Sequence, residues 1–338
     1  MAVTQFVDFL RTVRNRYSEV VSDGILEDYV IFKELQRANG APRAYKGIIG
    51  GEGGIINSVG GNQFEWRLLS KFMESGVFGP STRLSLTTPN VLKNPLLPMG
   101  GYFVGYFVST FETMSMNTKE QYIPLLKLYE QMAERTWYDK FETQILKDDS
   151  AAGGWSGLPV FMATTGAYAT NLTLSETNSK PAKFDYSGSG QSFDFSAMDR
   201  ISQITNEATH GDSQGGPDAP SVGFLGRTDW QKVKSLIEDT RHVVDVDTDM
   251  VKIGFRNFTY NGIRFYWSDH MQTQAINKVY VLNMNYLGLA HATTKLMMAD
   301  TAAVLDGIPG VLNLSLHKGQ IFCSNTRKQG FLDNTNLS

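Results

Sequence analysis

The sequence has 338 residues, of which 41% are hydrophobic and 19% are charged, and its formal net charge is −3. These values predict a globular chain of one large domain or two of ordinary size, without a low-complexity tail. Because 31 Lys and Arg residues stand against 34 Asp and Glu residues, the chain lacks the basic excess of a protein that grips nucleic acid through its phosphates.

The cysteine count and the hydropathy pattern exclude further classes. Cys323 is the single cysteine, which excludes an intramolecular disulfide framework and a Cys-rich zinc site. The first residues, MAVTQFVDFLRTVRNRYSEV, show no secretory signal, and no run of about 18 apolar residues could span a membrane. We therefore expect a soluble protein that is made in a cytoplasm and has no membrane partner.

The first third of the chain divides into a helical part and a glycine-rich part. Residues 4–38 show apolar residues at helical spacing and predict two helices. Residues 46–61 hold too many glycines to build a core, so we expect a flexible loop there. Residues 46–110 as a whole combine short strand-like pieces with a long strand at Tyr102–Ser115, which predicts an extended hairpin that a neighbour must cover.

The clearest helix is predicted over residues 118–147. Apolar side chains such as Trp137, Phe141 and Ile145 recur on one face, and Thr118 with Gln121 fits a capping box. At about 1.5 Å per residue this helix would be a rod of roughly 36–44 Å.

The middle of the chain predicts a strand, a helix and a hairpin. SVGFLG at 221–226 reads as a short buried strand, and Thr228–Asp239 reads as a helix. Asn261-Gly262 lies between two aromatic-rich runs, which predicts a hairpin over 255–267.

The last part predicts strands. Residues 278–291 read as a strand pair or as one bent strand. The apolar alternation that begins near 310 predicts a strand that turns at Lys318-Gly319 and returns through Cys323, which we expect to be a small buried apolar residue.

A search for catalytic chemistry yields one weak motif. Residues 211–216, GDSQGG, match G-x-S-x-G and would make Ser213 a nucleophile. A helix is expected before this serine and a Gly/Pro-rich loop after it, whereas a nucleophile elbow needs a strand before and a helix after. A polar surface loop is the favoured interpretation, and a serine hydrolase using Ser213 is the remaining alternative.

Phosphate and metal motifs are incomplete. The glycine run at 47–61 lacks the Gly-Lys-Ser/Thr ending of a phosphate loop. Asp245, Asp247 and Asp249 alternate as in a calcium loop, but Met250 stands where that loop needs glycine. No histidine pair has helical metal-site spacing. We predict no catalytic, metal or cofactor site.

Three blocks of sequence, in this order, carry a resemblance to a known family. The first is the glycine-rich region and the strand ending in FVGYFVSTFETMS, followed at once by the long helix. The second is APSVGFLGRTDWQKVKSLIE with VKIGFRNFTYNGIRFYWSDH and KVYVLNMNYLGLAH, and the third is GQIFCSNTRKQGFL. Over nearly the whole chain these blocks resemble the major capsid proteins of tailed bacteriophages with the Hong Kong 97-like fold.

The resemblance implies an α+β architecture in four parts. Residues 1–45 would be an N-terminal arm and residues 46–110 an extended loop over a neighbouring subunit. Residues 111–155 and 311–338 would form a peripheral domain with a long spine helix, and residues 156–310 an axial domain.

The resemblance also implies a structural virion protein that is not an enzyme. Copies would assemble in the host cytoplasm into pentamers and hexamers of an icosahedral capsid around double-stranded DNA. Further implied partners are a portal, scaffolding or decoration proteins, and DNA contacted non-specifically. A nanocompartment or gene-transfer shell of the same fold is the near alternative.

Aromatic residues of the predicted loop are the candidate interface residues, because aromatic side chains dominate interface hot spots. They are Phe64, Trp66, Phe72 and Phe78. The alternative is that they cover the core of their own subunit. Some family members cross-link lysine to asparagine, but Lys46, Lys71 and Lys93 have no identifiable partner, so we assign no cross-link.

Overall fold

We describe the chain from a computed structural model, which defines the segments that build the layers and leaves gaps between them. The described residues are 30–31, 34–35, 54–57, 62–66, 68–69, 92–109, 119–174, 180–185, 196–197, 199–201, 203, 220–240, 257–260, 262–275, 278–291, 298–299, 303–304 and 310–333.

The first sheet is organised around one long strand, β17 (Gly310–Cys323). The strand β6 (Gly100–Ser109) is antiparallel to β17 and pairs with it from Gly310↔Ser109 to Gly319↔Gly100. The remaining strands of this sheet are β1 (Gly54–Asn57), β14 (Leu287–His291), β15 (Met298–Ala299) and β16 (Ala303–Val304).

One long helix, α4 (Lys119–Leu146), lies against this sheet. Its 28 residues give a length of about 42 Å, so the predicted rod is confirmed. Trp137, Phe141 and Ile145 recur every four residues and are fully buried, because that spacing keeps them on one face. Thr118 of the predicted capping box lies outside the described residues.

The second sheet has the strand order β11-β12-β10-β13-β18-β9. These strands are β9 (Ala182–Asp185), β10 (Val222–Leu225), β11 (Asn257–Tyr260), β12 (Ile263–Trp267), β13 (Val279–Leu282) and β18 (Gly330–Asp333). The antiparallel pair β11–β12 confirms the predicted hairpin, and Gly262 in its turn has a φ of 79°.

The helices α7 (Arg227–Thr240) and α9 (Asp269–Gln274) lie beside the second sheet. The helix α7 packs Trp230 and Val233 against Phe258 and Phe265, so the predicted helix at 228–239 is confirmed. The short helix α9 follows β12 directly, and Ser268 caps it by accepting a hydrogen bond from the His270 backbone N–H.

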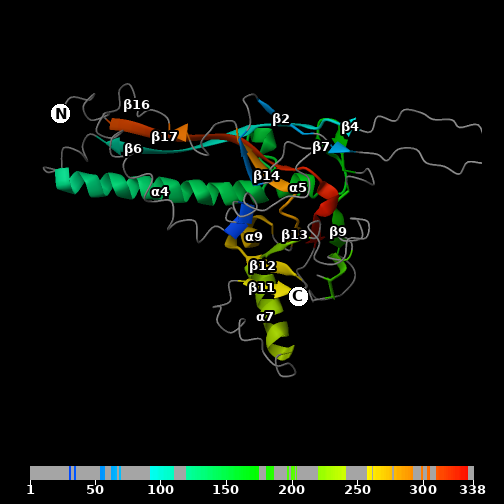
Figure 1. Ribbon diagram of the computed structural model, residues 1–338. Helices are drawn as coiled ribbons and strands as arrows, with labels where there is room; N and C mark the ends of the chain where they lie inside the picture. Colours follow the sequence, from blue (N-terminus) through cyan, green and yellow to red (C-terminus); the bar gives the residue numbers. More distant parts are fainter. Residues whose placement is uncertain are drawn as a thin grey trace, which may run out of the picture.

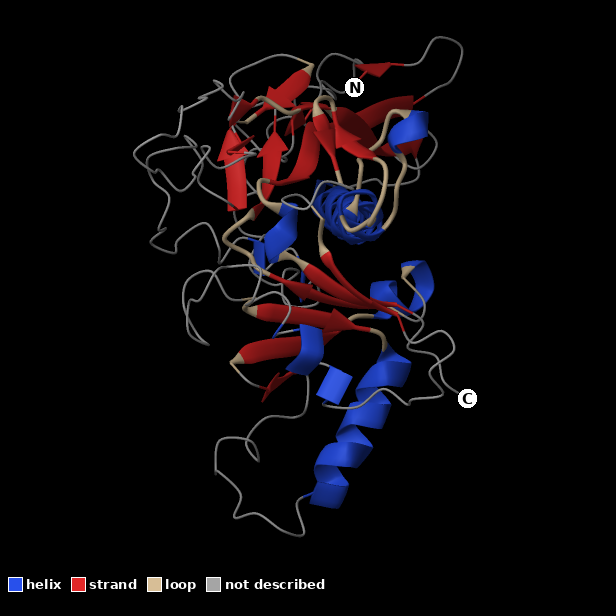
Figure 2. Cartoon of the chain, turned by 90° about the vertical axis from the view of Figure 1, so that its right-hand side faces the viewer, coloured by secondary structure: helices blue, strands red, loops and turns tan. Residues whose placement is uncertain are grey.

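The described elements form four layers (Figure 2). The first sheet, α4, the second sheet and α7 follow one another from top to bottom in that view. One apolar core extends from the first sheet past α4 to the second sheet, since it contains Phe322, Trp137 and Tyr266 together. A second core lies between the second sheet and α7.

Short elements complete the structure. They are β2 (Gln63–Glu65), which pairs with β5 (Leu96–Pro98), β3 (Leu68–Leu69), which pairs with β4 (Leu92–Lys93), β7 (Ala167–Ala169), which pairs with β8 (Leu172–Thr173), the helix α5 (Leu158–Phe161), and two 3₁₀ turns, η1 (Ser150–Ala152) and η2 (Thr326–Lys328).

Three sequence-based expectations are wrong. No turn interrupts β17 at Lys318-Gly319, because these residues pair with Gly101 and Gly100 of β6. Residues 278–291 are neither a pair nor one strand, since β13 and β14 belong to different sheets. The glycine run is not a loop throughout, because β1 pairs in parallel with β14 of the same chain.

The strand pairing also crosses the predicted domain boundaries. The strand β6, assigned to the extended loop at 46–110, pairs along its whole length with β17. The strand β18 lies within 311–338 but joins the second sheet, and β14 lies within 156–310 but joins the first. The division into four parts therefore stays a prediction, and each sheet contains strands from more than one of the predicted parts.

Candidate functional site

The strongest candidate surface lies on the part of the chain that projects furthest from the second sheet. The strands β6 and β17 and the first half of α4 extend together to the left in Figure 1, away from β11, β12 and α7. We call this part the arm: residues 100–109 of β6, 310–319 of β17 and 119–136 of α4.

One face of β6 attaches the arm to α4. Burial alternates along this strand, as expected for a strand with one covered face. The Tyr106 ring stacks on Tyr129 of α4 with centroids 5.9 Å apart, and its hydroxyl donates to Glu130 Oε1 at 3.5 Å. Tyr102 contacts Trp137 and Trp155, and its burial raises the pKa of its phenol far above the ordinary value of 10.0.

The opposite face of β6 and β17 is apolar and open. Phe103 pairs with Leu316 and Phe107 pairs with Leu312, and side chains paired directly across two strands point to the same face. Among the described residues, all five exposed large apolar side chains lie on the arm: Phe103 at 68%, Met132 at 57%, Leu128 at 50%, Leu316 at 40% and Phe107 at 36% exposure.

The strands of the arm carry little charge. From Gly100 to Ser109 and from Gly310 to Gly319 the sequence contains one charged residue, Lys318, whose amine donates to Asn62 Oδ1 at 2.6 Å. The solvated face of an antiparallel sheet usually carries polar residues. An exposed apolar face without them is typical of a surface that binds another protein.

The covered side of the arm holds two acidic residues one helical turn apart. Burial and the neighbouring Glu130 carboxylate raise the pKa of Glu134 above its ordinary value. Burial and Glu134 in turn raise the pKa of Tyr138 to about 12. Partial burial at this part of α4 therefore favours the neutral forms of Glu134 and Tyr138.

Comparison with known proteins gives structural matches only. No protein-family model and no curated protein matches the sequence. The capsid asymmetric unit of cyanophage A-1(L) superposes with a TM-score of 0.63 at 11% identity, over 82% of this chain and 90% of that chain. The capsid of cyanophage Pam1 gives 0.53 at 13% identity, over 82% and 86% of the two chains. The capsid of a native GTA particle gives 0.53 at 12% identity, over 88% and 92%.

This chain has the Hong Kong 97-like capsid fold. The match spans most of both chains. The α+β fold expected from the resemblance is thereby confirmed. The serine-hydrolase alternative is not supported, because the chain matches capsid shells, and Ser213 lies outside the described residues.

Two of the four predicted interface residues can be located in the capsid fold. Trp66 is buried, and its ring lies 5.8 Å from that of Tyr168 and 6.0 Å from that of Phe322. The Phe64 ring is half-buried, 4.4 Å from that of Phe322. These contacts cover the core of the same chain, and a role against a neighbouring subunit stays a prediction. Phe72 and Phe78 lie outside the described residues.

Three other polar features of the described segments were candidates for a ligand site. No group of three His, Cys, Asp or Glu residues in those segments could hold a metal ion. A pocket of about 260 Å³ contains Lys183, but this amine already pairs with Asp333 at 2.9 Å and with Asp185 at 3.2 Å. Burial raises the pKa of the Cys323 thiol to about 12, so this cysteine is protonated and unreactive.

Within the described residues, no helix has both the length and the apolar character needed to cross a bilayer.

The sequence analysis missed the open face of the arm. It identified residues 102–115 as a strand but did not select Phe103 and Phe107. The sequence of this strand has no charged residue and has aromatic residues at both alternating sets of positions. Because a strand that is covered on one face only usually carries polar residues on the other face, this pattern could have indicated an apolar surface that binds a partner.

Proposed function

We propose that this chain is a major capsid protein that assembles into pentamers and hexamers of an icosahedral shell. The capsid fold, shared with the cyanophage and GTA capsids, supports this role. Within this chain, the arm supports the proposal, because it exposes five large apolar side chains in an isolated subunit. Contacts between copies would cover these side chains, because every copy in a closed symmetric assembly uses the same surfaces.

Assembly through several modest contacts does not require any single contact to be tight. A specific interface of ordinary size buries roughly 1,600 Å² in total, and its affinity depends on a few central aromatic or apolar side chains. When each subunit makes several such contacts at once, their combined strength holds the shell. Phe103 and Leu316 are paired on the open face and are both exposed, so we expect them to be among those side chains.

The four-part division is also part of the proposal. Residues 1–45 would serve as an N-terminal arm and 46–110 as an extended loop toward a neighbour, with Phe64, Trp66, Phe72 and Phe78 near the contact. Residues 111–155 with 311–338 would be the peripheral domain, and 156–310 the axial domain.

The proposed content of the shell is double-stranded DNA. A net charge of −3 suits a wall that encloses DNA without gripping it. A portal and scaffolding or decoration proteins would be further partners, the shell would assemble in the host cytoplasm, and the chain would have no enzymatic activity.

A second candidate function uses the same fold. The match to the capsid of a native GTA particle favours a gene-transfer shell as an alternative to a phage capsid, and a nanocompartment stays the third possibility. Nuclease-protected DNA separates them: genome-length DNA indicates a phage capsid, short DNA of mixed sequence a gene-transfer shell, and an enclosed enzyme without DNA a nanocompartment.

Expression of the full chain alone tests assembly. Negative-stain microscopy and sedimentation velocity should show shells, tubes or sheets above a threshold concentration. A single small particle at every concentration would contradict the proposal.

A further inference from the structure

A helical segment near the N-terminus, described at residues 30, 31, 34 and 35, lies between α4 and the second sheet (Figure 1). Val30, Ile31, Glu34 and Leu35 are helical, and Ile31 and Leu35 are fully buried. Their side chains belong to the same core as Trp137 of α4 and Tyr266 of β12. This turn of helix therefore contributes to the core that the two layers share.

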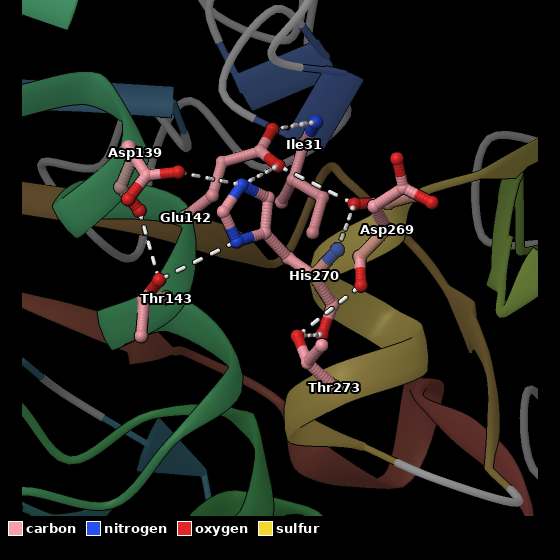
Figure 3. Close-up of polar contacts among 8 residues, drawn as sticks. Ile31, Asp139, Glu142, Thr143, Asp269, His270 and Thr273 are labelled. Atoms are coloured by element: carbon pink, nitrogen blue, oxygen red, sulfur yellow. Dashed lines mark hydrogen bonds and ion pairs between the residues drawn. The ribbon is translucent and has the colours of Figure 1, made fainter. Parts of the chain in front are cut away.

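The backbone of this turn is bound to α4. The Ile31 N–H donates to Glu142 Oε1 at 3.0 Å, over 111 residues of sequence (Figure 3). The Glu142 side chain is 1% exposed. A hydrogen bond to a buried carboxylate is stronger than one between neutral groups, so this contact fixes the turn firmly.

A side chain of the same turn is bound to the second sheet. The Tyr266 hydroxyl of β12 donates to Glu34 Oε1 at 2.9 Å, and Arg264 Nη2 of the same strand lies 3.5 Å from Glu34 Oε2. Ile31 and Glu34 are three residues apart, which places them on neighbouring positions of one helical face. One turn of helix is thus held by α4 on one side and by β12 on the other.

Glu142 also joins α4 to the segment that follows β12. Its Oε2 accepts from Ser268 Oγ at 3.5 Å and lies 4.0 Å from His270 Nε2. His270 in turn contacts Asp139 at 3.3 Å and Thr143 at 3.4 Å, both on α4 (Figure 3). Three elements that are distant in sequence meet at this one buried carboxylate.

We propose that Val30, Ile31, Glu34 and Leu35 act as a tie that fixes how α4 and the first sheet sit against the second sheet, and that this tie sets the shape in which the subunit assembles. The part that concerns assembly rests on the proposed function. The contacts of the tie act together, because breaking one set leaves a buried acidic side chain without its partners.

The first test measures coupling across the tie in the unassembled full-length chain. Tyr266→Phe removes the hydroxyl that binds Glu34 and leaves the ring in place. Hydrogen exchange of the Ile31 amide, which binds Glu142 on the other side of the turn, should become about tenfold faster. Tyr168→Phe is the matched control, because Tyr168 is also buried and its hydroxyl binds the Cys323 backbone N–H, away from residues 30–35. An Ile31 exchange rate in Tyr266→Phe equal to that of the control would overturn the tie.

The second test measures the consequence for assembly. Shells of Tyr266→Phe should vary in diameter or stay open, whereas shells of Tyr168→Phe should match the wild type. Faster Ile31 exchange with uniform, wild-type shells would overturn the claim that the tie sets the shape of the assembling subunit. If the wild-type chain forms no shells at all, the proposed capsid function fails instead, and the exchange measurement alone decides the tie.

Glu142 gives an independent check from α4. Glu142→Gln retains an oxygen that can accept from the Ile31 N–H, whereas Glu142→Ala does not. Ile31 exchange should therefore rise much more in Glu142→Ala than in Glu142→Gln. Equal rates in the two variants would contradict the assigned role of Glu142, and Tyr266→Phe keeps the proposal testable if Glu142→Ala does not fold.

Discussion

Gly310 of β17 makes room for the ring of Phe107 on β6. A Cβ atom added at Gly310 would lie 2.1 Å from Phe107 Cζ and 2.6 Å from the Val108 backbone oxygen. The aromatic ring thus lies over the glycine, and the backbone oxygen beside it cannot move without breaking the strand pair. This packing fixes the end of the open face of the arm.

Gly310→Ala should consequently destabilise the chain by about 1–3 kcal/mol, the usual cost of overpacking. Gly101→Ala in β6 is the matched control, because a Cβ there would meet only the His317 oxygen at 3.1 Å. Urea unfolding of the unassembled chain measures both. Equal losses in the two variants would show that the space above Gly310 is not the cause.

The hairpin turn offers a prediction that depends on backbone conformation alone. Gly262 has a φ of 79°, and a Cβ added there would meet nothing within 4 Å. Gly262→Ala should cost about 1–2 kcal/mol from left-handed strain, while Gly262→Asn should cost less because asparagine tolerates this conformation. Thermal unfolding that ranks Asn equal to or below Ala would contradict this explanation.

Trp66 distinguishes a core residue from an interface residue. Because its side chain is buried among Phe64, Tyr168 and Phe322, Trp66→Ala should lower the stability of the unassembled chain by about 3–5 kcal/mol. Phe103→Ala, on the open face, should change it by less than about 1 kcal/mol. A stable Trp66→Ala monomer that fails to assemble would restore the interface interpretation.

Asp149 gives a pH dependence. Its carboxylate accepts from Gln144 Nε2 at 2.5 Å and pairs with Lys147 at 2.8 Å, and the hydrogen bonds to these two side chains hold its pKa below the ordinary value of 3.8. As the pH falls, the unfolded chain takes up the proton first, so the contribution of Asp149 is complete above about pH 5 and is lost progressively as the pH falls past 3.8 to the lower pKa of the folded chain.

Asp149→Asn should therefore lower stability at neutral pH by less than about 1 kcal/mol and flatten the decline in stability between about pH 5 and pH 3. Unfolding curves at pH 7, 5 and 3 measure this, with Asp148→Asn as the control on the neighbouring carboxylate. An acid decline as steep in Asp149→Asn as in the wild type would contradict the assignment.

Local patterns predicted the elements that depend on local sequence. Apolar residues at spacings of three and four predicted the helix α4, and Asn261-Gly262 predicted the β11–β12 hairpin. Both predictions succeeded because the residues that determine these elements are close together in the sequence. The capsid fold itself was inferred from the order of such elements along the chain.

The features that could not be predicted depend on pairing between strands that are distant in the sequence. Lys318-Gly319 resembles a turn, but β6, more than 200 residues earlier, pairs across it and keeps β17 extended. Residues 278–291 look continuous, yet partners elsewhere draw β13 and β14 into separate sheets. The open face of the arm was missed for the same reason, because which face of β6 meets α4 depends on contacts between distant segments.

The central claim is that copies of this chain assemble through the open face of the arm. Phe103→Lys combined with Leu316→Lys places two charges on that face, and Thr259→Lys places one on an exposed position of β11 as the control. Sedimentation velocity of the three full-length chains tests the claim most directly. We predict shell-sized particles for the wild type and Thr259→Lys, and soluble, folded small species for the double variant; shells of normal size from the double variant would contradict the account.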